Sequence, residues 1–177
     1  QLGQVEAATA VYQRLAEKFS RDSRVLTEVA GALQHLGQDD QALKAWYRVV
    51  DATSDPEQRF EAETKVASLH RQQGDTAAAL RVFSRLLERV EPGSWRARPL
   101  RGQLNELLLE TGGAERRTSF WQARVNADPA DLDARLELAS ALAAQQQWAA
   151  AEQTLQDAAA RTRNNPSLRA AFIELLV

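Results

Sequence analysis

The feature that most constrains this chain is a short pattern that recurs five times along its length. In each copy, a turn residue is followed five positions later by a mostly small residue, and four positions after that by a large apolar residue. The large apolar residues are Tyr12, Trp46, Phe83, Trp121 and Leu155. They stand 34, 37, 38 and 34 positions apart. A period of about 34 residues predicts stacked repeats of two helices each.

Each repeat also carries two apolar stripes with helical spacing. In the last full repeat, apolar residues three and four positions apart mark one face of each expected helix. The first stripe consists of Leu132, Leu136, Leu138, Ala139 and Leu142, and the second of Trp148, Ala151, Leu155 and Ala158. No alternation of apolar and polar residues indicates a strand. The sequence therefore predicts an all-α fold.

Prolines and capping residues set the bounds of the expected elements. Proline can end one helix and begin another, and the prolines between repeats are Pro56, Pro92, Pro129 and Pro166. Asp75 and Asp131 stand where helix N-caps are needed. We expect ten helices near 4–19, 23–36, 39–52, 56–73, 76–90, 95–111, 114–127, 131–145, 148–163 and 166–176. They predict a single solenoid segment over 1–177, with a second-helix half-repeat at 1–20, repeats at about 23–55, 56–92, 95–129 and 131–165, and a first-helix half-repeat at 166–177.

The composition disfavours several classes of function. The formal net charge of −2 argues against a protein that binds nucleic acid through phosphate attraction. The sequence has no cysteine, which excludes disulfides, thiolate metal sites and cysteine nucleophiles. Its apolar runs are far too short to span a bilayer. We therefore expect no nucleic-acid partner and no insertion of this segment into a membrane.

A search for catalytic or metal-binding residues finds no convergent set. His35 and His70 lie in the first helices of consecutive repeats, but at different distances from the following turn and without a second pair of ligands. Gly112-Gly113 is not followed by the lysine of a phosphate-binding loop, and no serine lies in a nucleophile elbow. We expect no enzymatic activity, no cofactor and no metal, and interpret the two histidines as ordinary surface or packing residues.

The recurring residues resemble the tetratricopeptide repeat family. That family places a large residue and a Leu-Gly or Leu-Ala pair in the first helix, and an alanine, an aromatic residue and another alanine in the second. The matching residues are Val29, Ala30, Leu33, Gly37, Ala42 and Trp46, then Val66, Ala67, Gly74, Ala79 and Phe83, and finally Leu138, Ala139, Leu142, Ala151, Leu155 and Ala158. The resemblance extends over essentially the whole chain. It implies an α-solenoid of stacked antiparallel helix pairs in a right-handed superhelix.

In this family, first-helix residues line the groove that receives a partner. The resemblance places four triplets there: Thr27, Gly31 and Gln34; Thr64, Ser68 and Arg71; Gly102, Glu106 and Leu109; Leu136, Ser140 and Ala143. Receptors of chaperone tails carry a lysine and an asparagine at the first two positions of such a triplet, and no repeat of this chain does. The resemblance therefore implies a groove without the carboxylate clamp, open to a helix or an extended segment.

The repeat between Pro92 and Pro129 departs from the pattern. Asn105 and Arg117 take its small positions, and Arg124 replaces its last alanine. We expect a looser helix pair or a bend in the superhelix there. The alternative is a repeat that has drifted while keeping its large apolar residue as an anchor.

Arginines and tryptophans gather in this atypical repeat. One group comprises Trp95, Arg96, Arg98 and Arg101, and the other comprises Arg116, Arg117, Trp121 and Arg124. Exposed arginines beside aromatic rings could hold an acidic peptide or an anionic polymer. The alternative is a solvated face on which the arginines pair with Glu91, Glu106, Glu110 and Glu115. The candidate partner-binding residues are therefore Thr27, Gln34, Thr64, Ser68, Arg71, Trp95, Arg96, Arg98, Arg101, Glu106, Arg116 and Arg117.

These observations predict a non-catalytic scaffold that presents a curved helical groove to a protein or peptide partner. Family habit suggests an alternative, a periplasmic scaffold of a bacterial envelope or exopolysaccharide export system. An RNA-binding helical repeat is opposed by the mixed groove residues and the net charge. Arginine supplies 19 of the 22 basic residues, which is typical of GC-rich bacteria and suggests a bacterial cytoplasm or periplasm. The chain begins with Gln1 and has no methionine, so we expect it to be a fragment or a processed product. It opens with the second helix of a repeat and ends on an apolar first helix, whereas solenoid ends need a polar cap, so we expect the array to continue at both ends.

Overall fold

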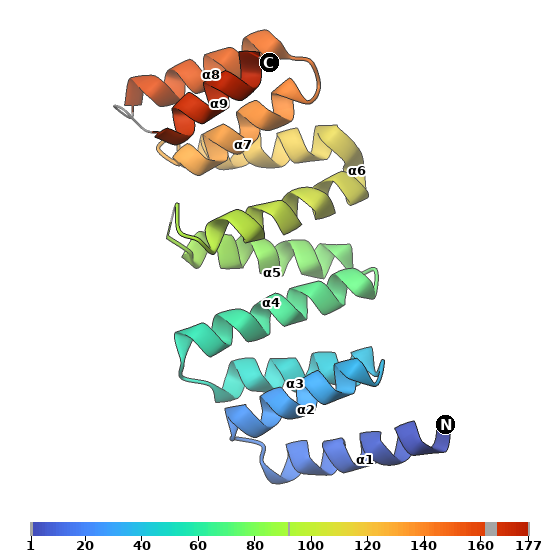
Figure 1. Ribbon diagram of the computed structural model, residues 1–177. Helices are drawn as coiled ribbons and strands as arrows, with labels where there is room; N and C mark the ends of the chain where they lie inside the picture. Colours follow the sequence, from blue (N-terminus) through green and yellow to red (C-terminus); the bar gives the residue numbers. More distant parts are fainter. Residues whose placement is uncertain (1, 92, 162–165, 177) are drawn as a thin grey trace. The chain divides into compact units, whose positions relative to one another are not determined.

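The computed structural model describes residues 2–91, 93–161 and 166–176, and this part of the chain contains helices, turns and loops but no strand. The chain forms two compact units, an N-terminal unit (Gln1–Arg89) and a C-terminal unit (Val90–Val177). The helices of the N-terminal unit are α1 (Leu2–Lys18), α2 (Ser23–His35), α3 (Asp39–Ala52), α4 (Pro56–Gln72) and α5 (Thr76–Arg89). Those of the C-terminal unit are α6 (Ala97–Ala127), α7 (Leu132–Ala143), α8 (Trp148–Arg161) and α9 (Pro166–Leu176) (Figure 1).

Aspartate side chains fix where several of these helices begin. Asp22, Asp55 and Asp131 each accept hydrogen bonds from backbone N–H groups in the helical turn that follows. These N–H groups have no partner within the helix, so the caps satisfy donors that would otherwise be lost. Asp75 accepts such a bond at 3.0 Å from the N–H three residues later, and the two predicted caps, Asp75 and Asp131, are thus confirmed.

In the N-terminal unit, each helix packs against its neighbour in the sequence (Figure 1). Ala30 on α2 and Ala42 on α3 are fully buried, which permits close approach of the two helices. Trp46 on α3 is only 6% exposed and belongs to the same core. The other buried members of this core are Ala16, Leu26, Val29, Leu33, Ala45, Val49, Ala62, Val66 and Leu69. The repeated small and large positions therefore build a shared core, as the period predicted.

In the C-terminal unit, α6 is broken into two helical segments (Figure 1). Gly112 has φ −170° and ψ 16°, and Gly113 has φ 65° and ψ −161°, a combination that essentially only glycine adopts. Trp121 on the second segment is 1% exposed. Helix α7 packs against α6, α8 and α9. A small core forms where Leu155 and Leu168 meet Ala139 and Ala158.

The predicted helices agree closely with those observed. Because Gly112-Gly113 divides α6, the described residues contain ten helical segments, and the predicted turn at this pair is found. The first segment of α6 begins at Ala97 rather than at 95, and α7 ends at Ala143 rather than at 145. The turn after α7 places Gln146 at φ 61°, where the matching turns carry Gly37 and Gly74. The expected repeat bounds and continuation beyond both ends remain predictions.

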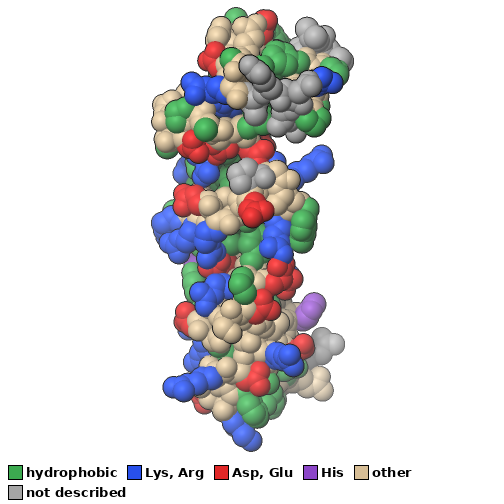
Figure 2. Space-filling view, turned by 90° about the vertical axis from the view of Figure 1, so that its left-hand side faces the viewer, with side chains coloured by type: hydrophobic (Ala, Val, Ile, Leu, Met, Phe, Trp, Pro, Cys, Tyr) green, Lys and Arg blue, Asp and Glu red, His purple; other side chains and the backbone are tan. Residues whose placement is uncertain are grey.

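The surface carries charges of both signs. Figure 2 shows lysine and arginine side chains interspersed with aspartate and glutamate on the face that it presents. Within the described ranges, no helix combines the length and the hydrophobicity that crossing a bilayer requires.

Candidate functional site

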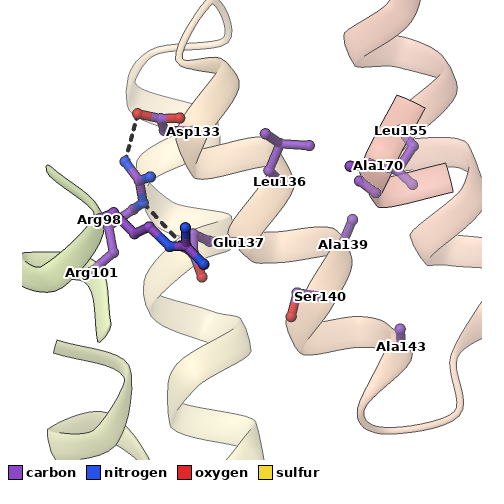
Figure 3. A pocket seen from close by; sticks show the side chains of 11 residues that line it. Arg98, Arg101, Asp133, Leu136, Glu137, Ala139, Ser140, Ala143, Leu155 and Ala170 are labelled. Carbon is purple, nitrogen blue, oxygen red and sulfur yellow. Dashed lines mark hydrogen bonds and ion pairs between the residues drawn. The ribbon is translucent and has the colours of Figure 1, made fainter. Parts of the chain in front are cut away.

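A pocket of about 580 Å³ opens in the C-terminal unit (Figure 3). Its walls come from the start of α6, from α7 and from α9, with one residue of α8 at its base. Such a volume lies in the usual range for ligand sites in proteins, about 300–1,000 Å³. The lining residues are Arg98, Arg101, Asp133, Leu136, Glu137, Ala139, Ser140, Ala143, Leu155, Ala170 and Ala171.

Arg101 forms one wall of the pocket by joining α6 to α7. Its Nη1 lies 2.6 Å from Oδ2 of Asp133, and its Nε lies 3.1 Å from Oε1 of Glu137 (Figure 3). The two acids stand four positions apart on α7, so they share one helical face. Asp133 also accepts a hydrogen bond of 3.0 Å from the backbone N–H of Gly93. The side chain of Arg101 is only 14% exposed, and its charge is compensated on both sides.

Glu137 connects this wall to the interior of the unit. Its Oε2 accepts a hydrogen bond of 2.7 Å from Nδ2 of Asn105. Oδ1 of Asn105 in turn accepts a hydrogen bond of 2.7 Å from Nε1 of the buried Trp121. Asn105 occupies a position where other repeats carry alanine, and its amide satisfies a buried indole and a carboxylate at once. These two bonds link both segments of α6 and join them to α7, and the expectation of a looser helix pair or a bend in the superhelix remains a prediction.

Arg117 adds a second link between α6 and α7. Its Nη2 donates a hydrogen bond of 2.9 Å to Oγ of Ser140 and lies 3.8 Å from Oε2 of Glu137. Its side chain is 14% exposed, so most of its length is packed. Like Asn105, this residue replaces a small one in the repeat pattern and is used for a polar contact between helices.

Arg98 differs from these two arginines. It lines the pocket and is exposed to solvent. Among the described residues, its guanidinium has no hydrogen-bond or ion-pair partner. In the described part of the pocket, Arg101 is thus a compensated cation, and Arg98 is a cation without an ion-pair partner.

Small and aliphatic side chains form the rest of the pocket. Ala139 and Leu155 are buried at its base, while Leu136 and Ala171 are half-buried and Ala170 is exposed. In Figure 3, Arg98 and Arg101 reach in from α6, and Leu136 and Ala170 lie farther along the pocket. The site therefore offers a cation beside an apolar surface.

The sequence model of the tetratricopeptide repeat family matches residues 1–57, 65–114 and 117–166. The chain belongs to the tetratricopeptide repeat family. A search of curated protein sequences finds no match. Tetratricopeptide repeats typically serve as scaffolds for protein interaction.

Solved structures share the tetratricopeptide fold at low sequence identity. MamA is 12% identical, with a TM-score of 0.53, and the match covers 90% of this chain and 89% of MamA. The TPR-like repeats described as a kinesin light chain of Podospora anserina are 18% identical, with a TM-score of 0.52 and coverage of 98% and 90%. The C-terminal part of a TPR repeat-containing protein from Cytophaga hutchinsonii is 11% identical, with a TM-score of 0.52 and coverage of 98% and 73%. These likenesses establish the α-solenoid of helix pairs.

The tetratricopeptide groove positions predicted in the N-terminal unit lie on α2 and α4. Thr27 donates to the backbone oxygen four residues earlier and accepts a hydrogen bond of 3.2 Å from Nε2 of Gln58. Thr64 and Ser68 likewise donate to the backbone of their own helix. Gln34 and Arg71 are half-buried. None of them lines the pocket of the C-terminal unit, and their role in binding stays a prediction.

The predicted residues of the C-terminal unit divide into two groups. Arg98 and Arg101 line the pocket, and Arg117 contacts its lining. The other four lie outside the lining, and they are Trp95, Arg96, Glu106 and Arg116. Trp95 is 77% exposed, and the guanidinium carbon of Arg96 lies 5.0 Å from the centre of its ring. The role of these seven residues in binding stays a prediction.

The acidic members of the site were missed by the sequence reasoning. Asp133 and Glu137 lie 32 and 36 positions after Arg101, about one repeat later. The sequence signal that could have identified them is their spacing, because acids about one repeat after an arginine can face it from the next first helix. The histidines are not brought together: His35 is exposed, and Nε2 of His70 lies 2.8 Å from the hydroxyl of Tyr47. Within the described ranges, no group of three or more potential ligand residues is placed to hold a metal ion.

Proposed function

We propose that this chain is a non-catalytic scaffold that binds a segment of a partner protein in the pocket of the C-terminal unit. The observation that carries the proposal is the origin of the lining. Most of it comes from the first helices of successive pairs, namely the start of α6, α7 and α9. Three helices thereby present side chains to the same space, which suits recognition of a helix or an extended segment.

The pocket is also preformed, which supports binding. The bonds from Arg101 to Asp133 and Glu137, and from Arg117 to Ser140, hold α6 and α7 together without any ligand. A wall that is already ordered loses little conformational entropy when a partner binds. Family membership supports the same function, since scaffolding by binding of protein segments is the usual role of these repeats.

The chemistry of the lining favours binding over catalysis. The carboxylates of Asp133 and Glu137 accept charge-assisted bonds from Arg101, so neither is poised as a general base. The hydroxyl of Ser140 contacts a guanidinium, not a base that could activate it as a nucleophile. These contacts support a role for the pocket in binding.

The test uses a side chain that fills the pocket. Random short peptides on an array are probed with the full chain, and the affinity of selected peptides is measured for Ala170→Trp. Ala170 is exposed and lines the pocket, so the indole should occupy the ligand volume without disturbing the core. Ala123→Trp is the matched control, because Ala123 is exposed on α6 outside the lining. Loss of binding in the first variant alone is expected; equal binding by both variants would contradict the proposal.

A further inference from the structure

The charges at the pocket of the C-terminal unit are not balanced. Three guanidinium groups, those of Arg98, Arg101 and Arg117, belong to the pocket or contact its lining, and two carboxylates face them. Arg101 contacts both carboxylates, at 2.6 Å and 3.1 Å, and Arg117 approaches one of them at 3.8 Å. No ion pair joins Arg98 to a carboxylate of the described residues. Within the described part of the pocket, one positive charge therefore remains uncompensated at an exposed edge.

The excess charge stands next to apolar surface. Leu136 and Ala171 are half-buried and Ala170 is exposed, so each leaves surface open to a ligand. Figure 3 shows Leu136 between the arginines of α6 on one side and Ala170 with Leu155 on the other. A ligand that spans the pocket would meet a cation first and aliphatic side chains next.

We infer that the pocket selects a protein segment that carries an aspartate or glutamate close to an aliphatic side chain. The carboxylate pairs with the guanidinium of Arg98, and the aliphatic side chain packs against Leu136 and Ala170. This inference rests on the proposed function and names the chemistry of its ligand. Charge-assisted bonds from arginine to a carboxylate are strong and directional, so they add selectivity to the apolar contact.

The other charge types fit this pocket less well. A lysine or arginine of the ligand would be repelled by Arg98 and would have to compete with Arg101 for Asp133 and Glu137. A neutral polar residue would desolvate Arg98 without compensating its charge. The site also differs from the clamp of the chaperone-tail receptors, whose matching positions on α6 hold Gly102 and Glu106. The acidic group is therefore expected within a segment and does not have to be a chain end.

The experiment compares peptides that differ only in charge. Peptides that the full chain binds on a random array are sorted by whether an acid lies near an aliphatic residue. A selected peptide and its Asn or Gln counterpart are then titrated against the wild type, Arg98→Glu and Arg161→Glu. Arg161 is an exposed arginine of α8 outside the lining, so it controls for net charge. We expect Arg98→Glu to weaken binding of the acidic peptide about tenfold and to remove its advantage over the amide peptide.

The outcomes separate the two proposals. If Ala170→Trp abolishes peptide binding, the docking site stands. If, in that case, the selected peptides are not enriched in acids or Arg98→Glu has no effect on their binding, the acidic preference is wrong. If binding is unaffected by Ala170→Trp, the docking site itself is wrong. A single-stranded RNA oligonucleotide is titrated in parallel. Binding of RNA that exceeds binding of the peptide and is lost in Arg98→Glu would overturn the inference in favour of an anionic polymer.

Discussion

The indole nitrogen of Trp121 donates a hydrogen bond of 2.7 Å to the side-chain oxygen of Asn105. Trp121 is the large residue of its repeat, and Asn105 takes the position where the neighbouring repeats have alanine. The amide nitrogen of Asn105 then reaches Glu137 on the next helix pair, at 2.7 Å. Asn105, a polar residue at a small position of the repeat pattern, thus connects the buried Trp121 to Glu137 in the wall of the pocket.

Asn105→Ala should destabilise the C-terminal unit. The substitution leaves the buried Nε1 of Trp121 without an acceptor and removes a donor from Glu137, which costs about 1–3 kcal/mol. Urea unfolding followed by tryptophan fluorescence measures the change. Asn126→Ala is the control, because among the described residues the side chain of Asn126 only accepts an exposed hydrogen bond from Gln122 on the same helix. Equal stability of the two variants would show that the network contributes nothing.

Trp46→Ala should be among the most damaging single substitutions in the N-terminal unit. Trp46 is 6% exposed within the core shared by α2, α3 and α4, and removal of a large buried aromatic side chain costs about 3–5 kcal/mol. Chemical denaturation of the full chain gives the value. Trp148→Ala serves as the comparison, since Trp148 is 53% exposed on α8. A loss below about 1 kcal/mol for Trp46→Ala would contradict its role as the filler of the core.

Gly113→Ala and Gly102→Ala should have opposite effects on the same helix. Gly113 has φ 65° and ψ −161°, where a side chain is strained by about 1–3 kcal/mol. Gly102 lies in the first segment of α6, and an added Cβ would meet nothing within 4 Å. Alanine there should stabilise the helix by roughly 0.4–1 kcal/mol. Thermal unfolding of both variants tests the pair, and a neutral Gly113→Ala would mean that the break in α6 tolerates ordinary backbone angles.

Arg101→Gln should destabilise the C-terminal unit, whereas Arg98→Gln should leave its stability nearly unchanged. Removal of Arg101 leaves Asp133 and Glu137 without their main cation in a partly buried position, and the expected loss is about 1–3 kcal/mol. Arg98 is exposed and has no partner among the described residues, so its substitution should change stability by less than about 0.5 kcal/mol. Denaturant midpoints of the two variants give the comparison, and equal losses would refute the distinction.

The helices could be predicted because their signals are local. A cap such as Asp131, or a turn at Gly112-Gly113, can be recognised from a few neighbouring residues of the sequence. The site was only partly predictable, because it depends on which residues of one repeat face the next. Arg101 was found from arginine clustering, whereas Asp133 and Glu137 required the register of α6 against α7.

The atypical repeat illustrates the same limit. From the sequence, a polar residue at a small position indicates weak packing, because the partner that would satisfy it is not visible. In the structure, Asn105 and Arg117 find those partners on α7, 32 and 23 positions away. The sequence does not reveal these contacts, because the free energy of each polar group depends on a partner in the next repeat.

Within each unit, the packing of helices against their neighbours in sequence has a kinetic consequence. Only short loops must close before neighbouring helices such as α2 and α3 gain their contacts. Chains dominated by such local contacts fold in microseconds to milliseconds, far faster than β-rich domains of the same size. The nascent chain can therefore bury each apolar stripe soon after the next helix is synthesised. It exposes little aggregation-prone apolar surface to other proteins during synthesis.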